Sequence, residues 1–343
     1  HGEGGIVWTG AVDGSIDNDV RITHPPGANF VSIPLAVGDG GFDNTLQLYG
    51  QNLDDPAGST TPFDTAPVIP SYYGYPTLGN AGAMSFQANF ASGRAYVTVV
   101  HDGDTNVVSQ FIGDRNVTSS SPYTYLYTPS SNERLNIAAK VAYSDDMTSS
   151  VEIRLFPTGG DSRRILANNV LDPQSPYSKF DNSLALDGDS TVAVVATRAS
   201  DNRRVLVRSD GVTTVEIAKA DPAGTIRDLA FFAPAINDAG VVAFRAKDEH
   251  GDAIYIGDGD SLKRIAGNGD VVETDLGTGQ LGQDNDSDPV FSGQPAINAR
   301  GDIAYVAGVH PEGDRGTEWG SGVFVVYAEP LVDDTLFADG FDG

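Results

Sequence analysis

Short runs of alternating apolar and polar residues recur along the chain, and glycine, asparagine or aspartate separates them. Residues 253–257 and 262–266 are two such runs, with an Asp-Gly dipeptide between them. An alternation of period two predicts half-buried β-strands, and Asp-Gly or Asn-Gly between strands predicts tight hairpin turns. The pattern therefore predicts an all-β fold built from hairpins.

Part of this pattern is repeated. Residues 234–244 and 295–305 share Pro-Ala-Ile-Asn, a glycine three residues after the asparagine, and an apolar stretch that ends in Phe244 or Tyr305. With Gly240 as the anchor, the pattern has proline six residues before it, Asn or Asp three before it and a large apolar residue four after it, and weaker copies match it in part. The anchors fall at positions 4, 82, 135, 190, 240 and 301. This spacing indicates about six copies of one repeat.

Each copy continues with two further alternating segments, which gives four short strands per unit. Four-stranded units of this length predict the blades of a β-propeller, in which neighbouring blades cover both faces of each small sheet. We therefore predict a single propeller domain over residues 1–343 with about six four-stranded blades. A count of seven stays open, and the alternative architecture is a solenoid, which would need polar capping repeats.

The sequence begins at His1, within the first repeat, so we expect this repeat to lack its opening strand. The C-terminal segment 335–340 resembles residues 183–188, which form the opening strand of another repeat. We predict that 335–340 completes the first blade, so that the sheet has no open edge. Insertion of the same strand into a neighbouring molecule is the alternative, and it would make a polymer.

The repeated Asn-x-x-Gly-x-x-x-aromatic signature at Asn237 and Asn298 resembles the tandem-repeat proteins of the NxxGxxAF type. That resemblance implies a repeat fold and export from a bacterial cell, and it implies no reaction and no catalytic residue. The ending 336–342 also looks like C-terminal tails of secreted proteobacterial proteins. It points to the same compartment.

The charge and amino-acid composition of the chain limit the classes of partner that it can bind. The formal net charge of −26 repels phosphate backbones and anionic lipid, so we expect neither nucleic acid nor membrane insertion. The chain has no cysteine, which excludes disulfides and thiolate chemistry. It starts at His1 without methionine, which we interpret as a mature form trimmed after export. We expect a secreted protein, extracellular or at the cell surface, whose partners are matrix, glycan or copies of itself.

Acidic clusters are the densest chemical signal. Three Asp-Gly-Asp segments, at 102–104, 187–189 and 258–260, favour hairpin turns over cation sites. The cluster in a long linker between repeats is different, because alternating aspartates on such a loop can converge on a hard cation. The residues Asp284, Asp286 and Asp288 are therefore a candidate calcium site. No fingerprint predicts an organic cofactor.

The sequence gives weaker signals for catalytic residues than for acidic clusters. His101 precedes Asp102 at a strand end, and six tyrosines could stack on sugars, namely Tyr72, Tyr73, Tyr75, Tyr123, Tyr125 and Tyr127. Polysaccharide lyases on propeller folds combine His, Tyr and Arg, but alternating aromatics usually pack a core. The two Arg pairs, 163–164 and 203–204, precede strands and suggest solvated edges. An N-terminal His1 can bind copper, yet signal cleavage explains it without a metal.

Two function classes follow. The first is a secreted structural or interaction protein, an acidic repeat scaffold that binds calcium and assembles through its terminal strands. The second is a glycan-active enzyme, a polysaccharide lyase or hydrolase that uses a pocket of the propeller. We favour the first, because no motif in the chain has a recognised catalytic spacing.

Overall fold

The computed structural model describes residues 84–102, 105–283, 285, 288–317 and 319–328, together with the four strands that precede residue 84. All regular elements in these residues are β-strands, which confirms the all-β prediction. Within the same residues no helix has the length and apolar character needed to cross a membrane. The chain divides into two compact units, His1–Asn202 with Ser209–Thr214, and Arg203–Arg208 with Val215–Gly343. We call them unit 1 and unit 2.

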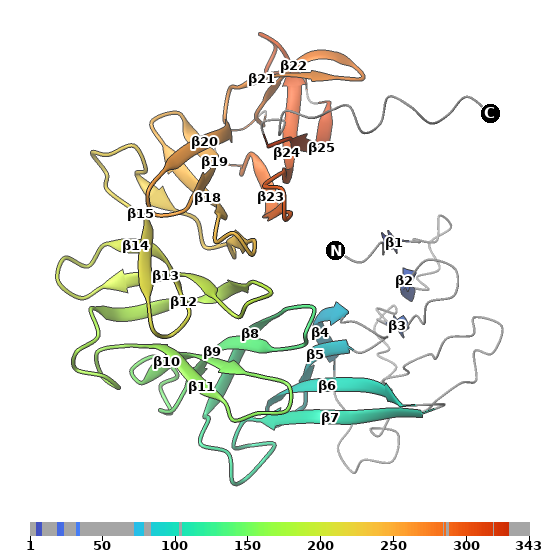
Figure 1. The fold of residues 1–343 in the computed structure, drawn as a ribbon. Helices are drawn as coiled ribbons and strands as arrows, with labels where there is room; N and C mark the ends of the chain where they lie inside the picture. Colours follow the sequence, from blue (N-terminus) through green and yellow to red (C-terminus); the bar gives the residue numbers. More distant parts are fainter. Residues whose placement is uncertain are drawn as a thin grey trace. The chain divides into compact units, whose positions relative to one another are not determined.

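Unit 1 contains small antiparallel sheets made from consecutive strands (Figure 1). The first sheet has three strands, in the order β1 (Gly5–Trp8), β2 (Asp19–Thr23) and β3 (Ser32–Pro34). The second has four, β4 (Tyr72–Leu78), β5 (Met84–Asn89), β6 (Arg94–Asp102) and β7 (Thr105–Gly113). The third has four, β8 (Tyr125–Ser131), β9 (Ile137–Ala142), β10 (Val151–Phe156) and β11 (Arg163–Ala167). A hairpin follows, β12 (Tyr177–Leu186) with β13 (Val192–Arg198).

Unit 2 begins with β14 (Arg204–Ser209) and β15 (Thr214–Lys219). Its first complete sheet contains β16 (Asp228–Leu229), β17 (Ala235–Ile236), β18 (Val242–Asp248), β19 (Gly251–Gly257) and β20 (Leu262–Gly267). Its second contains β21 (Val271–Thr274), β22 (Gly277–Leu281), β23 (Phe291–Ile297), β24 (Ile303–Pro311) and β25 (Gly320–Val326).

The two sheets of unit 2 depart from the expected four strands for separate reasons. In the first, residues 230–234 interrupt the opening strand, so that β16 and β17 both pair with β18. In the second, β24 pairs with β23, β25 and, near its end, β22, which brings the β21–β22 hairpin into the sheet. The repeated unit is therefore a small antiparallel sheet with local additions.

The core follows the second strand of each sheet. Strands β5 and β9 are buried at every position, although a sheet with one wet face would show alternation. The opening strand of the next sheet covers one face of these strands, because β8 contacts β5, β12 contacts β9, and β23 contacts β18. Each of these opening strands covers the preceding sheet of its own unit.

One turn recurs between the first and second strands. Four of its residues have positive φ, namely Leu135 (60°), Ser190 (68°), Gly240 (75°) and Gly301 (89°). They occupy the anchor positions 135, 190, 240 and 301, while positions 4 and 82 lie outside the described residues. In every copy the Asn or Asp three residues earlier accepts a hydrogen bond through its side chain from the amide one residue after the anchor, at 2.7–3.1 Å. This contact explains the Asx-x-x-anchor spacing.

The asparagines of this turn also join successive sheets. Asn132 Nδ2 donates to the carbonyl oxygen of Asp187 at 2.9 Å, and Asp187 is the equivalent residue in the next turn. Within unit 2, Asn237 Nδ2 donates to the carbonyl oxygen of Asn298 at 3.1 Å, and Asn298 is again the equivalent residue in the next turn. An aspartate has no such donor, so asparagine at this position serves both the turn and its neighbour.

Candidate functional site

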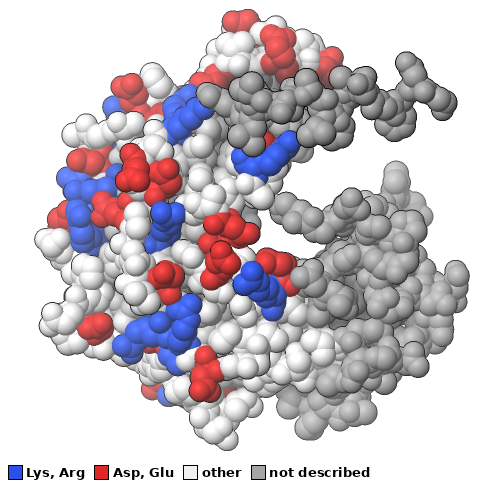
Figure 2. All heavy atoms as spheres, viewed as in Figure 1, with Lys and Arg blue, Asp and Glu red and all other residues white. Residues whose placement is uncertain are grey.

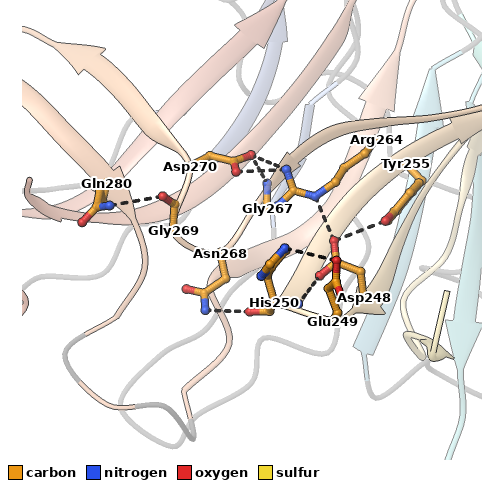
Figure 3. A network of polar contacts seen from close by, with 10 residues as sticks. All are labelled: Asp248, Glu249, His250, Tyr255, Arg264, Gly267, Asn268, Gly269, Asp270 and Gln280. Atoms are coloured by element: carbon orange, nitrogen blue, oxygen red, sulfur yellow. Dashed lines mark hydrogen bonds and ion pairs between the residues drawn. The ribbon is translucent and has the colours of Figure 1, made fainter. Parts of the chain in front are cut away.

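Unit 2 contains a pocket of about 930 Å³ lined by three turns and by the ends of β18 to β20. The turn that follows β18 is a hairpin in which Asp248 pairs with Gly251, whose φ is 111°. Asp248 Oδ1 accepts a hydrogen bond of 2.7 Å from the His250 amide, which fixes the turn. This geometry directs Asp248, His250 and Tyr255 of β19 to the pocket (Figure 3).

Arg264 of β20 lies between two carboxylates of this pocket (Figure 3). Its Nε donates to Asp248 Oδ2 at 2.8 Å, and its Nη1 donates to Asp270 Oδ2 at 2.7 Å. Tyr255 Oη donates to the same oxygen of Asp248 at 3.2 Å. The Gly267 amide donates to Asp270 Oδ2 at 2.7 Å, which closes the turn after β20. The network therefore ties one hairpin end to the next turn of the chain.

The titration of these groups follows from burial and charge. Burial alone would raise the pKa of Asp248, but the His250 amide and Arg264 together hold it below its usual value. Burial raises the pKa of Tyr255, and the adjacent Asp248 carboxylate raises it further. At neutral pH, Asp248 is therefore ionised and Tyr255 is protonated.

This arrangement limits the chemistry of the pocket. Asp248, Glu249 and Asp270 outnumber Arg264, so the pocket favours neutral or cationic groups over an acidic sugar. The charge of Arg264 is already balanced, since its Nε and Nη1 are engaged by the carboxylates of Asp248 and Asp270. His250 is about two-thirds exposed, and its Nε2 lies 3.5 Å from Glu249. The pKa of Asp248 is lowered, whereas a general acid for glycoside hydrolysis needs a raised one.

A second feature is found in the opening strands, all of which are irregular. The register shifts once along β4, β8 and β23 and twice along β12, and residues 230–234 separate β16 from β17 at the equivalent place. Several bulge residues are exposed, namely Tyr75 (53%), Phe231 (75%) and Phe232 (48%). Bulges of this kind redirect side chains away from the sheet, often beside binding sites.

In three of these opening strands, β8, β12 and β23, a side chain of the preceding sheet holds the bulge. The donors lie five residues after an anchor, and we call Gln87, Lys140 and Arg245 the inter-sheet donors. Gln87 Nε2 donates to the Tyr127 carbonyl oxygen at 3.0 Å. Lys140 Nζ donates to that of Phe180 at 2.9 Å. Arg245 Nη1 donates to that of Gly293 at 2.8 Å. All three side chains are almost fully buried, so each contact is a rigid link between sheets of one unit.

The candidate calcium site is only partly described. Asp284 and Asp286 lie outside the described residues, and the amide of Asp288 donates to the Asn285 carbonyl oxygen at 3.1 Å. Within the described part of the chain, no three His, Asp or Glu side chains converge as metal ligands. Calcium at 284–288 therefore stays a prediction. Two Asp-Gly-Asp segments act in turns, because Asp187 and Asp258 accept amide hydrogen bonds there.

Only some of the glycan candidates lie within the described residues. His1, His24 and the side chains of His101, Tyr72 and Tyr73 lie outside the described residues. Tyr123 is buried in the core cluster of its sheet, in agreement with the packing interpretation. Tyr125 and Tyr127 meet edge to face, with ring centroids 4.7 Å apart.

The interpretation of the Arg pairs as solvated edges is wrong at Arg204. Its side chain is 16% exposed and donates to the Leu229 and Ala230 carbonyl oxygens. Arg164 is exposed on the edge strand β11, in agreement with the interpretation, and it also pairs at 2.7 Å with Glu152, which is fully buried. Both arginines satisfy buried acceptors, and only the tertiary structure brings those acceptors near.

Acidic and basic side chains lie intermixed over the described part of one face (Figure 2). The inter-sheet donors were missed from the sequence, although aligning the repeats on their anchors places them in one column. That column reads Gln87, Lys140, Val195, Arg245 and Val306. A polar residue inside a buried strand at the same place in three repeats was the available signal.

The sequence matches no protein-family model and no curated protein sequence. Three solved structures are similar in fold at 8–11% identity. Polysaccharide lyase Uly1 matches 75% of this chain and 58% of its own, with a TM-score of 0.39. Hadza microbial sialidase Hz136 matches 91% and 67%, with a TM-score of 0.40. Prolyl oligopeptidase B from Galerina marginata matches 85% and 49%, with a TM-score of 0.33. The chain thus spans about three fifths of the lyase and half of the oligopeptidase.

Proposed function

We propose that the chain is a secreted interaction scaffold that binds an extracellular partner through the bulged opening strands of its repeats. The inter-sheet donors carry this proposal. They anchor the bulges of β8, β12 and β23 by a buried hydrogen bond from the preceding sheet, so that exposed residues of those bulges, such as Asn182 and Gln294, are presented on a rigid support. Pre-organised exposed side chains lose little conformational entropy on binding, which favours a recognition surface.

We further propose that the sheets form a closed propeller of about six blades. The opening strands pack on the preceding sheets within each unit, which is the contact that blades make. The sheet β1–β3 has three strands, one fewer than the four-stranded sheets that follow it in unit 1. Residues 335–340 would supply the missing strand.

A glycan-active enzyme is the second candidate, because Tyr255, His250 and Arg264 line one pocket. The state of these groups favours binding over catalysis. Arg264 is neutralised by two carboxylates, and Tyr255 is held protonated beside an ionised Asp248. A lyase would need a free cation for the substrate carboxylate and a group ready to accept a proton.

Binding and cleavage are separated by one experiment. The purified chain is incubated with neutral, cationic and uronate-containing polysaccharides, and cosedimentation is compared with the release of reducing ends and unsaturated products. We expect binding without product. Product that disappears in Tyr255→Phe, a change that removes only the hydroxyl, would establish the enzyme and overturn the scaffold proposal.

We also propose calcium as a structural ion at Asp284, Asp286 and Asp288. Calcium should then raise the melting temperature, since an ion bound only to the folded state stabilises it. Asp286→Asn should abolish that increase. Equal melting temperatures in calcium and in chelator would remove the site.

A further inference from the structure

Two consecutive phenylalanines are exposed in unit 2. Phe231 and Phe232 lie in the interruption between β16 and β17, and they are 75% and 48% exposed. A regular strand would send one of two consecutive side chains into the sheet. The interruption removes that constraint, and both rings remain at the surface. Large apolar side chains exposed side by side mark an interaction site more often than isolated ones do.

Each ring lies against an arginine. The guanidinium carbon of Arg204 is 4.0 Å from the centroid of Phe231, and that of Arg245 is 4.0 Å from the centroid of Phe232. Arg204 is held by Asp228 at 3.2 Å, and Arg245 is held by the Gly293 carbonyl oxygen at 2.8 Å. The cation–π contacts therefore fix the rings in place.

Arg245 of β18, like Lys140 of β9, is a buried cation. It is 7% exposed, and no carboxylate of the described residues forms an ion pair with it. Its Nε and Nη2 donate to no atom of the described residues. Burial lowers the pKa of Arg245, and Asp252, which pairs with Lys247 at 3.8 Å, offsets only part of that effect. A buried cation normally has a counter-ion, and none of the described carboxylates pairs with this one.

We infer that Phe231, Phe232 and Arg245 bind an acidic pyranose unit of a glycan, a uronic acid whose C–H face packs on the rings and whose carboxylate pairs with Arg245. The inference rests on the proposed binding function and names its ligand class. A single sugar offers an apolar face and an anionic group at the short separation that these adjacent side chains require.

Two other ligand classes fit less well. A peptide that adds a strand needs a continuous sheet edge, and residues 230–234 break the edge here. Nucleic acid carries a denser row of charges, which a chain of net charge −26 repels. The anionic pocket beside Arg264 is a separate place with the opposite charge preference.

The test uses a matched pair of probes, oligogalacturonate and the same oligosaccharide with its carboxyl groups methyl-esterified. Isothermal titration calorimetry should show the free acid binding at least about tenfold more tightly, as expected for a charge-assisted hydrogen bond. Phe231→Ala and Phe232→Ala should each weaken binding of the free acid by a similar factor. Arg245→Gln should remove the difference between the two probes.

The matched control is Tyr327→Ala, which removes an aromatic ring of unit 2 that is 71% exposed and should leave binding unchanged. The probe comparison in the unmodified protein does not depend on whether Arg245→Gln folds. Equal binding of both probes overturns the acidic class but leaves a scaffold that binds neutral glycan. Unchanged binding in both phenylalanine variants would show that the glycan binds elsewhere on the protein.

Two further outcomes are decisive. Oligoglutamate bound as tightly as oligogalacturonate would replace the sugar by an acidic peptide and overturn the inference. Cleavage of oligogalacturonate would overturn the scaffold proposal, while loss of binding in the phenylalanine variants would still locate the site. The two proposals therefore fail in distinguishable ways.

Discussion

At the scale of single residues, the recurring turn depends on one backbone conformation. Gly240 and Gly301 adopt positive φ without the penalty that a side chain would add, whereas Leu135 and Ser190 carry that penalty. The turn therefore tolerates a non-glycine anchor. What surrounds the anchor then decides the effect of a substitution.

Gly240→Ala and Gly301→Ala test this distinction. Both place a side chain at positive φ, which costs about 1–2 kcal/mol. At Gly301 the added carbon meets only Ala328, at 3.6 Å. At Gly240 it collides with Arg208 Nη1, which donates to the Gly240 carbonyl oxygen at 2.6 Å. We expect Gly240→Ala to lose about 1–2 kcal/mol more than Gly301→Ala in urea unfolding. Equal losses would mean that Arg208 moves freely.

At the scale of elements, the inter-sheet donors place polar groups inside strands that are otherwise core. Lys140 shows the consequence most directly. It is 6% exposed, its Nζ donates to Asn182 Oδ1 at 3.0 Å, and it lies 4.2 Å from the centroid of Tyr127. Burial lowers its pKa to about 8, and Asp181 opposes that shift.

This pKa predicts a pH dependence of stability. The unfolded chain holds the Lys140 proton up to about pH 10.5, whereas the folded chain releases it near pH 8. The unfolded state binds more protons between these values, so the contribution of Lys140 to stability rises with pH across that window. We expect the free energy of unfolding of the wild type, relative to Lys140→Met, to increase from pH 8 to pH 10.

Lys179→Met is the matched control, because Lys179 is an exposed lysine of β12. The free energy of unfolding of the Lys179→Met variant should change with pH in the same way as that of the wild type between pH 8 and pH 10. Parallel pH profiles for the wild type and Lys140→Met would show that the lysine reaches solvent in the folded protein.

At the scale of the whole molecule, the proposed ring depends on its last strand. Deletion of 331–343 should lower the melting temperature, while light scattering should still show a monomer, because closure within one chain is the expected arrangement. Leu336→Ser with Phe337→Ser is the matched full-length variant and should have the same effect. A wild-type polymer that becomes monomeric on deletion would instead establish strand donation between molecules.

Local features of the fold could be predicted from sequence. The all-β class, the hairpin turns and the anchors at 135, 190, 240 and 301 follow from residues that are close in the chain, since period-two alternation and Asx-x-x-Gly act over a few positions. The candidate sites could not. Asp248 and Arg264 are 16 residues apart, and nothing in the spacing selects this pair among 47 acidic residues.

The sequence by itself determined where strands and turns lie, because those depend on backbone preferences and local hydrogen bonds. Only the tertiary structure decided which polar side chains are buried donors and which aromatics are exposed. Arg245 lies in an apolar strand, yet its partner Gly293 is 48 residues away. Phe231 and Phe232 look like core residues, yet the broken opening strand leaves them at the surface. Packing between sheets determines both the burial of Arg245 and the exposure of the two phenylalanines. It brings together residues that no local sequence pattern connects.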